Sequence, residues 1–204
     1  MSFYHDRILP WLTHLAMQQS RLAPYRDRVI SGASGRVLEV GIGSGLNLPR
    51  YRSGVDRIIG LDPSPKLLAM AHASARASAM PVELIEGSAE AIPIEDRAVD
   101  TVVTTWTMCS VPDVGRALQE MRRVLRPGGR LLFVEHGRAP EPRVRWWQDH
   151  LNPGWKRLAG GCHLNRAIEE LIAGAGFQFE RLDKGYMRGP KPMTFFYEGS
   201  ARPR

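Results

Sequence analysis

The feature that most constrains the fold is a glycine loop at residues 39–45, which reads Glu-Val-Gly-Ile-Gly-Ser-Gly. A segment with strand character, residues 36–40, leads into it, and a short helix is expected after it. Glycines at alternate positions let the backbone turn tightly and approach a ligand, because no Cβ blocks the way. The free N–H groups at the start of a helix can also hold an anionic group. In open α/β sheets such a loop lies at the carboxyl edge of the strands, where ligands bind.

Strand and helix patterns alternate after this point, which is typical of a parallel sheet covered on both faces. The sequence predicts strands at 36–40, 57–61, 82–85, 99–105 and 130–135, and helices at 65–77 and 113–125. Residues 140–176 are predicted to be largely helical, with interruptions at Pro153 and Gly160-Gly161, and strands at 177–182 and 193–197 to pair across Gly189-Pro190. We therefore expect an α/β fold: a Rossmann-like, mostly parallel seven-stranded sheet with helices on both faces and a C-terminal antiparallel hairpin.

The first 31 residues differ from the rest because their apolar residues recur at helical spacing, with Pro10 and Pro24 as the expected helix boundaries. Residues 32–35, Gly-Ala-Ser-Gly, end this pattern. We expect an N-terminal helical lid at 1–31 and one domain at 32–204, a size that suits a single core. Simple packing of these helices on the sheet is the alternative.

Composition narrows the function classes. The chain carries 28 Lys and Arg against 21 Asp and Glu, a net charge of +7. The basic residues are mostly arginines spread over the whole length, which favours a solvated surface, with an acidic partner as the other reading. No apolar run approaches the roughly 20 residues that a bilayer requires, and no secretory signal is visible. Two cysteines without a CxxC argue against a disulfide scaffold. We therefore expect a soluble, cytoplasmic protein.

An acidic residue, Asp62, follows the second predicted strand about 20 residues beyond the loop, where a carboxylate can accept hydrogen bonds from both ribose hydroxyls of an adenosine. The glycine spacing is G-x-G-x-G, and Leu46 occupies the place where a dinucleotide site needs its third glycine. Glu39 is unfavourable to a pyrophosphate but suits an amino group, such as that of S-adenosylmethionine. The alternative is a tight turn with Asp62 capping the helix that begins near Pro65.

Four segments carry further motifs: Val37–Gly45, Gly60–Ser64, Gly87–Pro93 and Val124–Gly129. Together they resemble the class I S-adenosylmethionine-dependent methyltransferases, in the branch that includes the ubiquinone-biosynthesis C-methyltransferases. The resemblance implies that residues 88–90 border the adenine, although many relatives carry Asp in place of Ser88. With the loop, the expected cofactor-binding residues are Glu39, Gly41, Gly43, Gly45, Asp62, Pro63, Ser88, Ala89, Glu90 and Thr105.

Four more segments extend the likeness beyond this core: Thr107–Val111, Phe133–His136, Trp147–Trp155 and Gly161–Arg166. They look like segments of the methyltransferase-like alkyl-thiol methyltransferases of animal microsomes. The chain departs from those enzymes in lacking their N-terminal membrane anchor, so the resemblance implies a soluble version. The anchored enzymes meet lipophilic thiols at a membrane, and the substrate here stays open.

Methyl transfer from a sulfonium is an in-line displacement, so the protein mainly holds the reacting atoms within about 3–3.5 Å. A thiol reacts as its thiolate and, with a free pKa of about 8.5, needs no strong base, whereas a carbon or hydroxyl acceptor usually does. The candidate catalytic residues are His136, to accept a proton or orient the acceptor, and its neighbour Glu135; a structural histidine is the alternative. The candidate substrate residues, with core packing as the alternative for the tryptophans, are Tyr4, Trp106, Cys109, Trp147 and Trp155.

Several functions remain open at this level. The leading hypothesis is S-methylation of a small apolar thiol, followed by O- or C-methylation of a quinol, phenol or lipid precursor. A nucleic-acid methyltransferase and a non-catalytic S-adenosylmethionine-binding protein are the alternatives of another class. Cys109 and Cys162, with His136 or His163, show no metal-ligand spacing, so we expect no metal and no cysteine nucleophile. We expect a monomer or weak homodimer.

Overall fold

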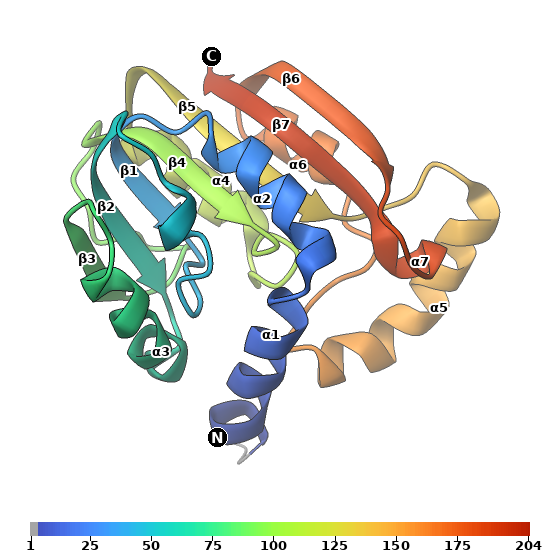
Figure 1. The fold of residues 1–204 in the computed structure, drawn as a ribbon. Helices are drawn as coiled ribbons and strands as arrows, with labels where there is room; N and C mark the ends of the chain where they lie inside the picture. Colours follow the sequence, from blue (N-terminus) through green and yellow to red (C-terminus); the bar gives the residue numbers. More distant parts are fainter. Residues whose placement is uncertain (1–3) are drawn as a thin grey trace.

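The computed structural model describes residues 4–204, and its centre is a seven-stranded sheet of order β3-β2-β1-β4-β5-β7-β6 (Figure 1). The strands are β1 (Gly35–Val40), β2 (Val55–Asp62), β3 (Val82–Glu86), β4 (Val99–Thr105), β5 (Leu125–His136), β6 (Phe177–Tyr186) and β7 (Phe195–Pro203). The first five pair in parallel, whereas β7 is antiparallel to both β5 and β6. The predicted Rossmann-like fold with a C-terminal antiparallel pair is confirmed.

Helices cover both faces of the sheet. One face carries α2 (Ala23–Ile30) and α3 (Pro65–Arg76), and the other carries α4 (Val114–Val124) and α6 (Ile168–Gly174). The remaining helices are α1 (Leu9–Met17), α5 (Pro142–Leu158) and the single turn α7 (Lys191–Thr194). In Figure 1, α1 and α5 lie below the sheet, beyond the arrowheads of the parallel strands. They therefore border the edge at which such sheets bind ligands.

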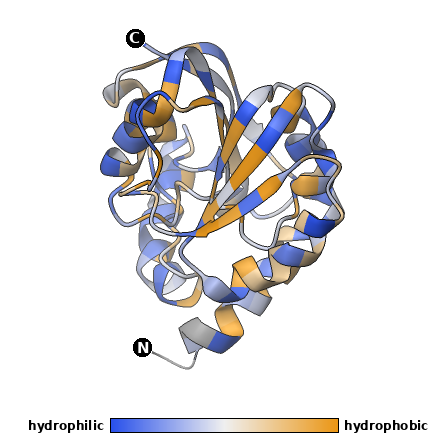
Figure 2. Ribbon diagram, turned by 90° about the vertical axis from the view of Figure 1, so that its left-hand side faces the viewer, coloured by the Kyte–Doolittle hydropathy of each residue, from blue (hydrophilic) through white to orange (hydrophobic). Residues whose placement is uncertain are grey.

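The core follows the two-residue period of the strands. Val37, Val103 and Val134 point to the layer that contains α2, whereas Leu38, Val102 and Phe133 point to the layer of α4 and α6. Both sets are almost completely buried. Central strands that are apolar on both faces are expected in a parallel sheet covered on two sides. Figure 2 shows these strands as largely orange, between helices that carry blue segments.

Several local predictions differ from the structure. The interruption expected at Pro153 is wrong: α5 continues through this residue, which is exposed to solvent. The helix instead ends before Gly160-Gly161, as predicted, and both glycines have positive φ. The last strand begins at Phe195 rather than Met193, because α7 occupies the connection. The helix expected after the glycine loop is only the 3-10 turn Leu48–Arg50.

Across residues 4–204, none of the helices combines the length and the apolar character that a bilayer crossing requires.

Candidate functional site

A cavity of about 840 Å³ opens at the carboxyl edge of the parallel strands, between α1 and α5. This volume is typical of sites for small molecules and cofactors. We call the part next to β1 and β2 the β2 side; it is lined by Gly41, Gly43, Asp62, Ser88 and Ala89. We call the part next to β4 and β5 the β5 side; it is lined by Trp106, Cys109, His136, Trp155 and Cys162.

The glycine loop forms the floor of the β2 side. Gly41, Gly43 and Gly45 all have positive φ, as the alternating pattern predicts. A Cβ on Gly41 would overlap the side chain of Thr107, so this position tolerates no side chain. Gly45 does not line the cavity: its Cα faces α3, where an added Cβ would lie 3.3 Å from Ala71. The first two glycines therefore leave space for the cavity, and the third lets the loop pack against α3.

Asp62 ends β2 and turns its carboxylate toward the loop. Its Oδ2 accepts a hydrogen bond from the Gly43 N–H and its Oδ1 accepts one from the Ser64 N–H, both at 2.9 Å. Burial raises the pKa of this carboxyl, and the two backbone hydrogen bonds oppose the rise. Each carboxylate oxygen keeps further lone pairs and Asp62 lines the cavity. This pair of acceptor oxygens fits a vicinal diol such as a ribose.

Glu39 lies beneath the cavity and does not line it. Its Oε1 accepts a hydrogen bond from Asn47 Nδ2 at 2.7 Å, and its Oε2 accepts one from the Tyr51 hydroxyl at 2.8 Å. Burial raises the pKa of Glu39 to about 7, although both hydrogen bonds and the Arg26 charge oppose the rise. The structure thus places Glu39 as a support for Asn47, which also donates to Thr105 Oγ1 at 3.1 Å.

Arg26, from α2, is a cavity-lining cation that sequence reasoning missed. Its Nη1 donates to Asn47 Oδ1 at 2.7 Å, and its guanidinium lies 4.8 Å from the centre of the Trp106 ring. Burial lowers the pKa of Arg26 to about 10, against the opposing charge of Glu39. The sequence gives little sign of this role, because Arg26 belongs to a helix that precedes the domain motifs.

The other expected cofactor residues divide into two groups. Pro63, Ser88, Ala89 and Thr105 line the cavity. Glu90 does not: its Oε1 accepts a hydrogen bond from the Asp113 N–H at 2.5 Å, next to the start of α4. Of the predicted 88–90 segment, the first two residues therefore reach the cavity.

One residue of the β5 side, Trp106, has a strained backbone. Trp106 has a φ of 52°, a conformation that bulky side chains rarely adopt. Such strain costs on the order of 1–3 kcal/mol and persists only where the surroundings impose it. The backbone N–H of Trp106 donates a hydrogen bond to the Val134 carbonyl at 2.8 Å. This bond holds the end of β4 against β5. The turn sets the indole in the cavity wall, as expected for a substrate residue.

Glu135, one of the two candidate catalytic residues, is fully buried and does not line the cavity. Its Oε1 accepts hydrogen bonds from the N–H groups of Thr107 and Met108 at 2.7 and 2.9 Å, whereas its Oε2 has no partner among the groups that the structure describes. Burial raises the pKa of this carboxyl, and these backbone bonds oppose the rise. The geometry makes Glu135 a support of the loop that carries Cys109.

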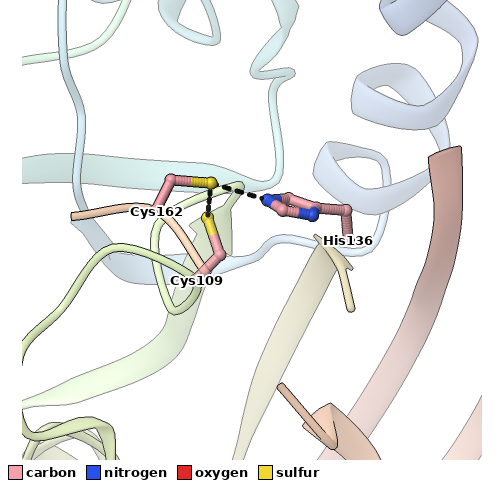
Figure 3. A group of neighbouring side chains, drawn as sticks. All are labelled: Cys109, His136 and Cys162. Atoms are coloured by element: carbon pink, nitrogen blue, oxygen red, sulfur yellow. Dashed lines mark hydrogen bonds between the residues drawn. The ribbon is translucent and has the colours of Figure 1, made fainter. Parts of the chain in front are cut away.

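His136, the other candidate, lines the cavity and contacts Cys162, whose Sγ lies 3.0 Å from its Nε2 (Figure 3). Burial lowers the pKa of His136, but the hydrogen bond to Cys162 and the charge of Glu135 outweigh this effect, so the pKa is raised overall. The hydrogen bond to Cys109 and burial raise the pKa of Cys162. Cys162 was not among the predicted site residues, although the likeness at Gly161–Arg166 included it.

The aromatic candidates have different positions. Tyr4 and Trp155 line the cavity, and the Tyr4 hydroxyl donates to the Leu158 carbonyl of α5 at 2.6 Å. Trp155 Nε1 is buried without a partner in the described part of the chain. Trp147 lies on the outer face of α5, with 53% of its surface exposed, and does not line the cavity. The structure therefore gives Trp147 no contact with a ligand there.

Comparison with known proteins agrees with this architecture. Residues 38–133 match the family model described as a methyltransferase domain. The chain is 35% identical over 178 residues to the human thiol S-methyltransferase TMT1B, covering 83% of this chain and 70% of that one. It is 34% identical over 118 residues to the demethylmenaquinone methyltransferase of Thermus thermophilus, covering 56% and 53%.

A solved structure of an S-adenosylmethionine-dependent methyltransferase from Thermotoga maritima has the same fold, with a TM-score of 0.70 at 19% identity and full coverage of both chains. A chain this similar to TMT1B over most of its length, with a methyltransferase domain on this fold, belongs to the class I S-adenosylmethionine-dependent methyltransferases.

Proposed function

We propose that this methyltransferase transfers a methyl group to the sulfur of a small apolar thiol. The observation that carries the proposal is the composition of the β5 side, where His136 and two thiols line the cavity and, among the side chains that the structure describes, no carboxylate does. A thiolate acceptor needs no strong base, since a thiol of pKa about 8.5 is partly ionised at neutral pH. The thiol S-methyltransferase TMT1B, at 35% identity, supports this choice.

The cavity walls favour an apolar acceptor. The residues that α1, α5 and the β6–β7 connection contribute are mostly apolar: Leu9, Leu12, Met17, Trp155, Leu158, Met187 and Met193. An apolar acceptor that leaves water for this cavity gains about 25 cal/mol for each Å² it buries.

On the β2 side, S-adenosylmethionine supplies an electrophilic methyl group on a sulfonium when it is bound. Asp62 would accept hydrogen bonds from the two ribose hydroxyls, Ser88 and Ala89 would border the adenine, and Thr105 would lie beside the methionine moiety. Glu39 acts through Asn47, which holds Thr105 and Arg26 in place. On the β5 side, the Trp106 ring, which already lies next to Arg26, would also favour a sulfonium.

In our proposal, the lid expected at residues 1–31, of which the first three lie outside the described residues, covers this cavity. The Tyr4 hydroxyl reaches α5, and His14 Nδ1 lies 2.6 Å from the hydroxyl of Ser44 in the glycine loop. These contacts join the N-terminal helices to both sides of the cavity. Closure of such a segment sequesters the reactants from water.

Methylation of a quinol or phenol is the second candidate, favoured by the similarity to a demethylmenaquinone methyltransferase. A phenol with a pKa near 10 needs a general base, and on the β5 side His136 would have to provide it. The two candidates therefore differ in whether the acceptor must lose a tightly held proton.

Matched acceptors distinguish the two functions. The purified enzyme is incubated with S-adenosylmethionine and with pairs that differ only in the acceptor atom, such as hexanethiol and hexanol, or thiophenol and phenol. We expect methyl thioethers from the thiols, detected by mass spectrometry, and no methyl ethers. Turnover confined to phenols or quinols would overturn the thiol assignment, and binding without any transfer would favour a non-catalytic role.

A further inference from the structure

Three potential metal ligands meet on the β5 side of the cavity. Cys109 follows β4, His136 ends β5, and Cys162 lies in the loop after α5; their ligand atoms are all within 4.8 Å of one another (Figure 3). Cys162 Sγ lies 3.7 Å from Cys109 Sγ and 3.0 Å from His136 Nε2. Because all three side chains line the cavity, an ion held among them would face the acceptor.

The spacing of the two sulfurs suits a tetrahedral ion. Zn²⁺ binds thiolates at about 2.3 Å, which places two sulfurs of a tetrahedral site about 3.8 Å apart. The observed 3.7 Å therefore needs almost no adjustment. The His136–Cys162 distance would open by about 0.5 Å to reach the spacing expected for a nitrogen and a sulfur ligand. Soft thiolate ligands with an imidazole select zinc over the harder Mg²⁺ and Ca²⁺.

Hydrogen bonds close to each of the three ligands connect the segments that carry them. The His163 N–H donates to the Cys109 carbonyl at 2.8 Å and joins the two cysteine loops. The buried amide of Gln148 donates to the carbonyls of Gly137 and Leu164, both at 2.9 Å. Glu135 holds the backbone just before Cys109. Supporting bonds of this kind orient ligands in metal sites.

We propose that Cys109, His136 and Cys162 bind one Zn²⁺ ion, and that its open fourth position binds the sulfur of the methyl acceptor. Three protein ligands with one open position are the arrangement of catalytic zinc sites. The identity of the fourth ligand rests on the thiol function proposed above, whereas binding of the ion does not. His136 then acts as a ligand and not as a base.

The step balances without an oxidant or reductant. Binding of Zn²⁺ displaces the protons of Cys109 and Cys162 to solvent, and binding of the acceptor displaces its thiol proton in the same way. A lone pair of the bound sulfur then forms a bond to the methyl carbon. The bond from that carbon to the donor sulfur breaks, and its electron pair stays on S-adenosylhomocysteine. The product is a neutral thioether, a weaker ligand than a thiolate, and leaves the ion.

The metal content of the whole purified protein tests the site directly. The protein is stripped with a chelator, incubated with Zn²⁺, desalted and analysed by elemental mass spectrometry. We expect one zinc ion per chain in the wild type, strong loss of zinc in Cys109→Ser, Cys162→Ser and His136→Asn, and full retention in His72→Asn, a control on α3. Circular dichroism and S-adenosylhomocysteine binding establish that each variant is folded. Absence of stoichiometric zinc in the wild type, or equal retention in all variants, would overturn the proposal.

Cobalt substitution tests the fourth ligand. Co²⁺ in the stripped protein should show thiolate-to-cobalt charge-transfer absorption, which changes when hexanethiol is added and stays the same with hexanol. A bound cobalt ion that ignores the thiol would overturn the acceptor assignment. Thiol methylation that survives complete removal of metal would overturn the role of zinc in binding the acceptor and leave the thiol function intact. Zinc binding without turnover of any thiol would leave the metal site intact and overturn the thiol function.

Discussion

The two sides of the cavity are built in opposite ways. The β2 side comes mainly from one continuous loop, residues 39–45, and from the acid that ends the next strand. The β5 side gathers Cys109, His136 and Cys162 across separations of 26 and 53 residues. A binding site made of backbone turns can be predicted from consecutive residues in the sequence. A site made of side chains from distant segments can be recognised only once the chain is folded.

The largest expected effect on cofactor binding is at Gly41, because the β2 side is built from the backbone of the glycine loop. Gly41→Val should abolish detectable binding of S-adenosylhomocysteine in calorimetry, because the new side chain overlaps Thr107 and a β-branched residue is strained at a φ of 73°. Gly128→Ala is the control, since its φ of 81° is equally unfavourable but its surroundings are open. Normal binding by the Gly41 variant would show that the loop does not form the cofactor floor.

Glu39 supports the β2 side from within the protein interior, and the pH dependence of stability tests this buried position. Its pKa rises from the ordinary 4.5 to about 7 on folding, so the stability it contributes is complete below pH 4.5 and is lost as the pH rises through 7. Glu39→Gln keeps the hydrogen-bonding shape without the charge. Between pH 5 and pH 8, the free energy of unfolding of the wild type should fall relative to this variant by on the order of 2–3 kcal/mol. Parallel denaturation curves would contradict the buried-carboxyl account.

Asp62 tests the proposed contact with the ribose. Asp62→Asn should weaken binding of S-adenosylhomocysteine about 30-fold, or about 2 kcal/mol, because one charge-assisted acceptor is lost. The control is Asp96→Asn, at an exposed carboxylate that pairs with Arg123 far from the cavity. Unchanged affinity in a calorimetric titration of the Asp62 variant would remove the ribose assignment.

The smallest effect is expected from the lid. His14→Ala removes the contact with Ser44 and should weaken cofactor binding about fivefold, or about 1 kcal/mol. Leu15→Ala, on the exposed side of α1, serves as the control. Hydrogen exchange in α1 should slow when S-adenosylhomocysteine binds to the wild type. Equal exchange with and without ligand would favour simple packing of the N-terminal helices.

Sequence patterns predicted the sheet because each strand has its own local signal. The strand at 99–105 was predicted with its observed bounds, and the antiparallel C-terminal pair was also expected. Pro153 misled the prediction because an interior proline removes one backbone hydrogen bond and kinks or breaks a helix, whereas α5 continues through it. The extent of α7 depends on packing that no short segment specifies.

The sequence likewise predicted some residues of the candidate site and not others. Gly41, Gly43 and Asp62 line the cavity as their spacing suggests, whereas Glu39 and Glu135 carry acidic side chains at promising positions but turn them into the protein interior. Charge at the end of a strand does not reveal which way a side chain points. Arg26 and Asn47 were missed because their roles arise from a buried network between segments 21 residues apart.

The position of the transferred methyl group tests the central claim most directly. 4-Mercaptophenol offers a thiol and a phenol on one ring, so both atoms compete within the same cavity under the same conditions. After incubation with S-adenosylmethionine, nuclear magnetic resonance of the product should show the methyl group on sulfur alone. A methyl group on oxygen, with the thiol left free, would contradict the account.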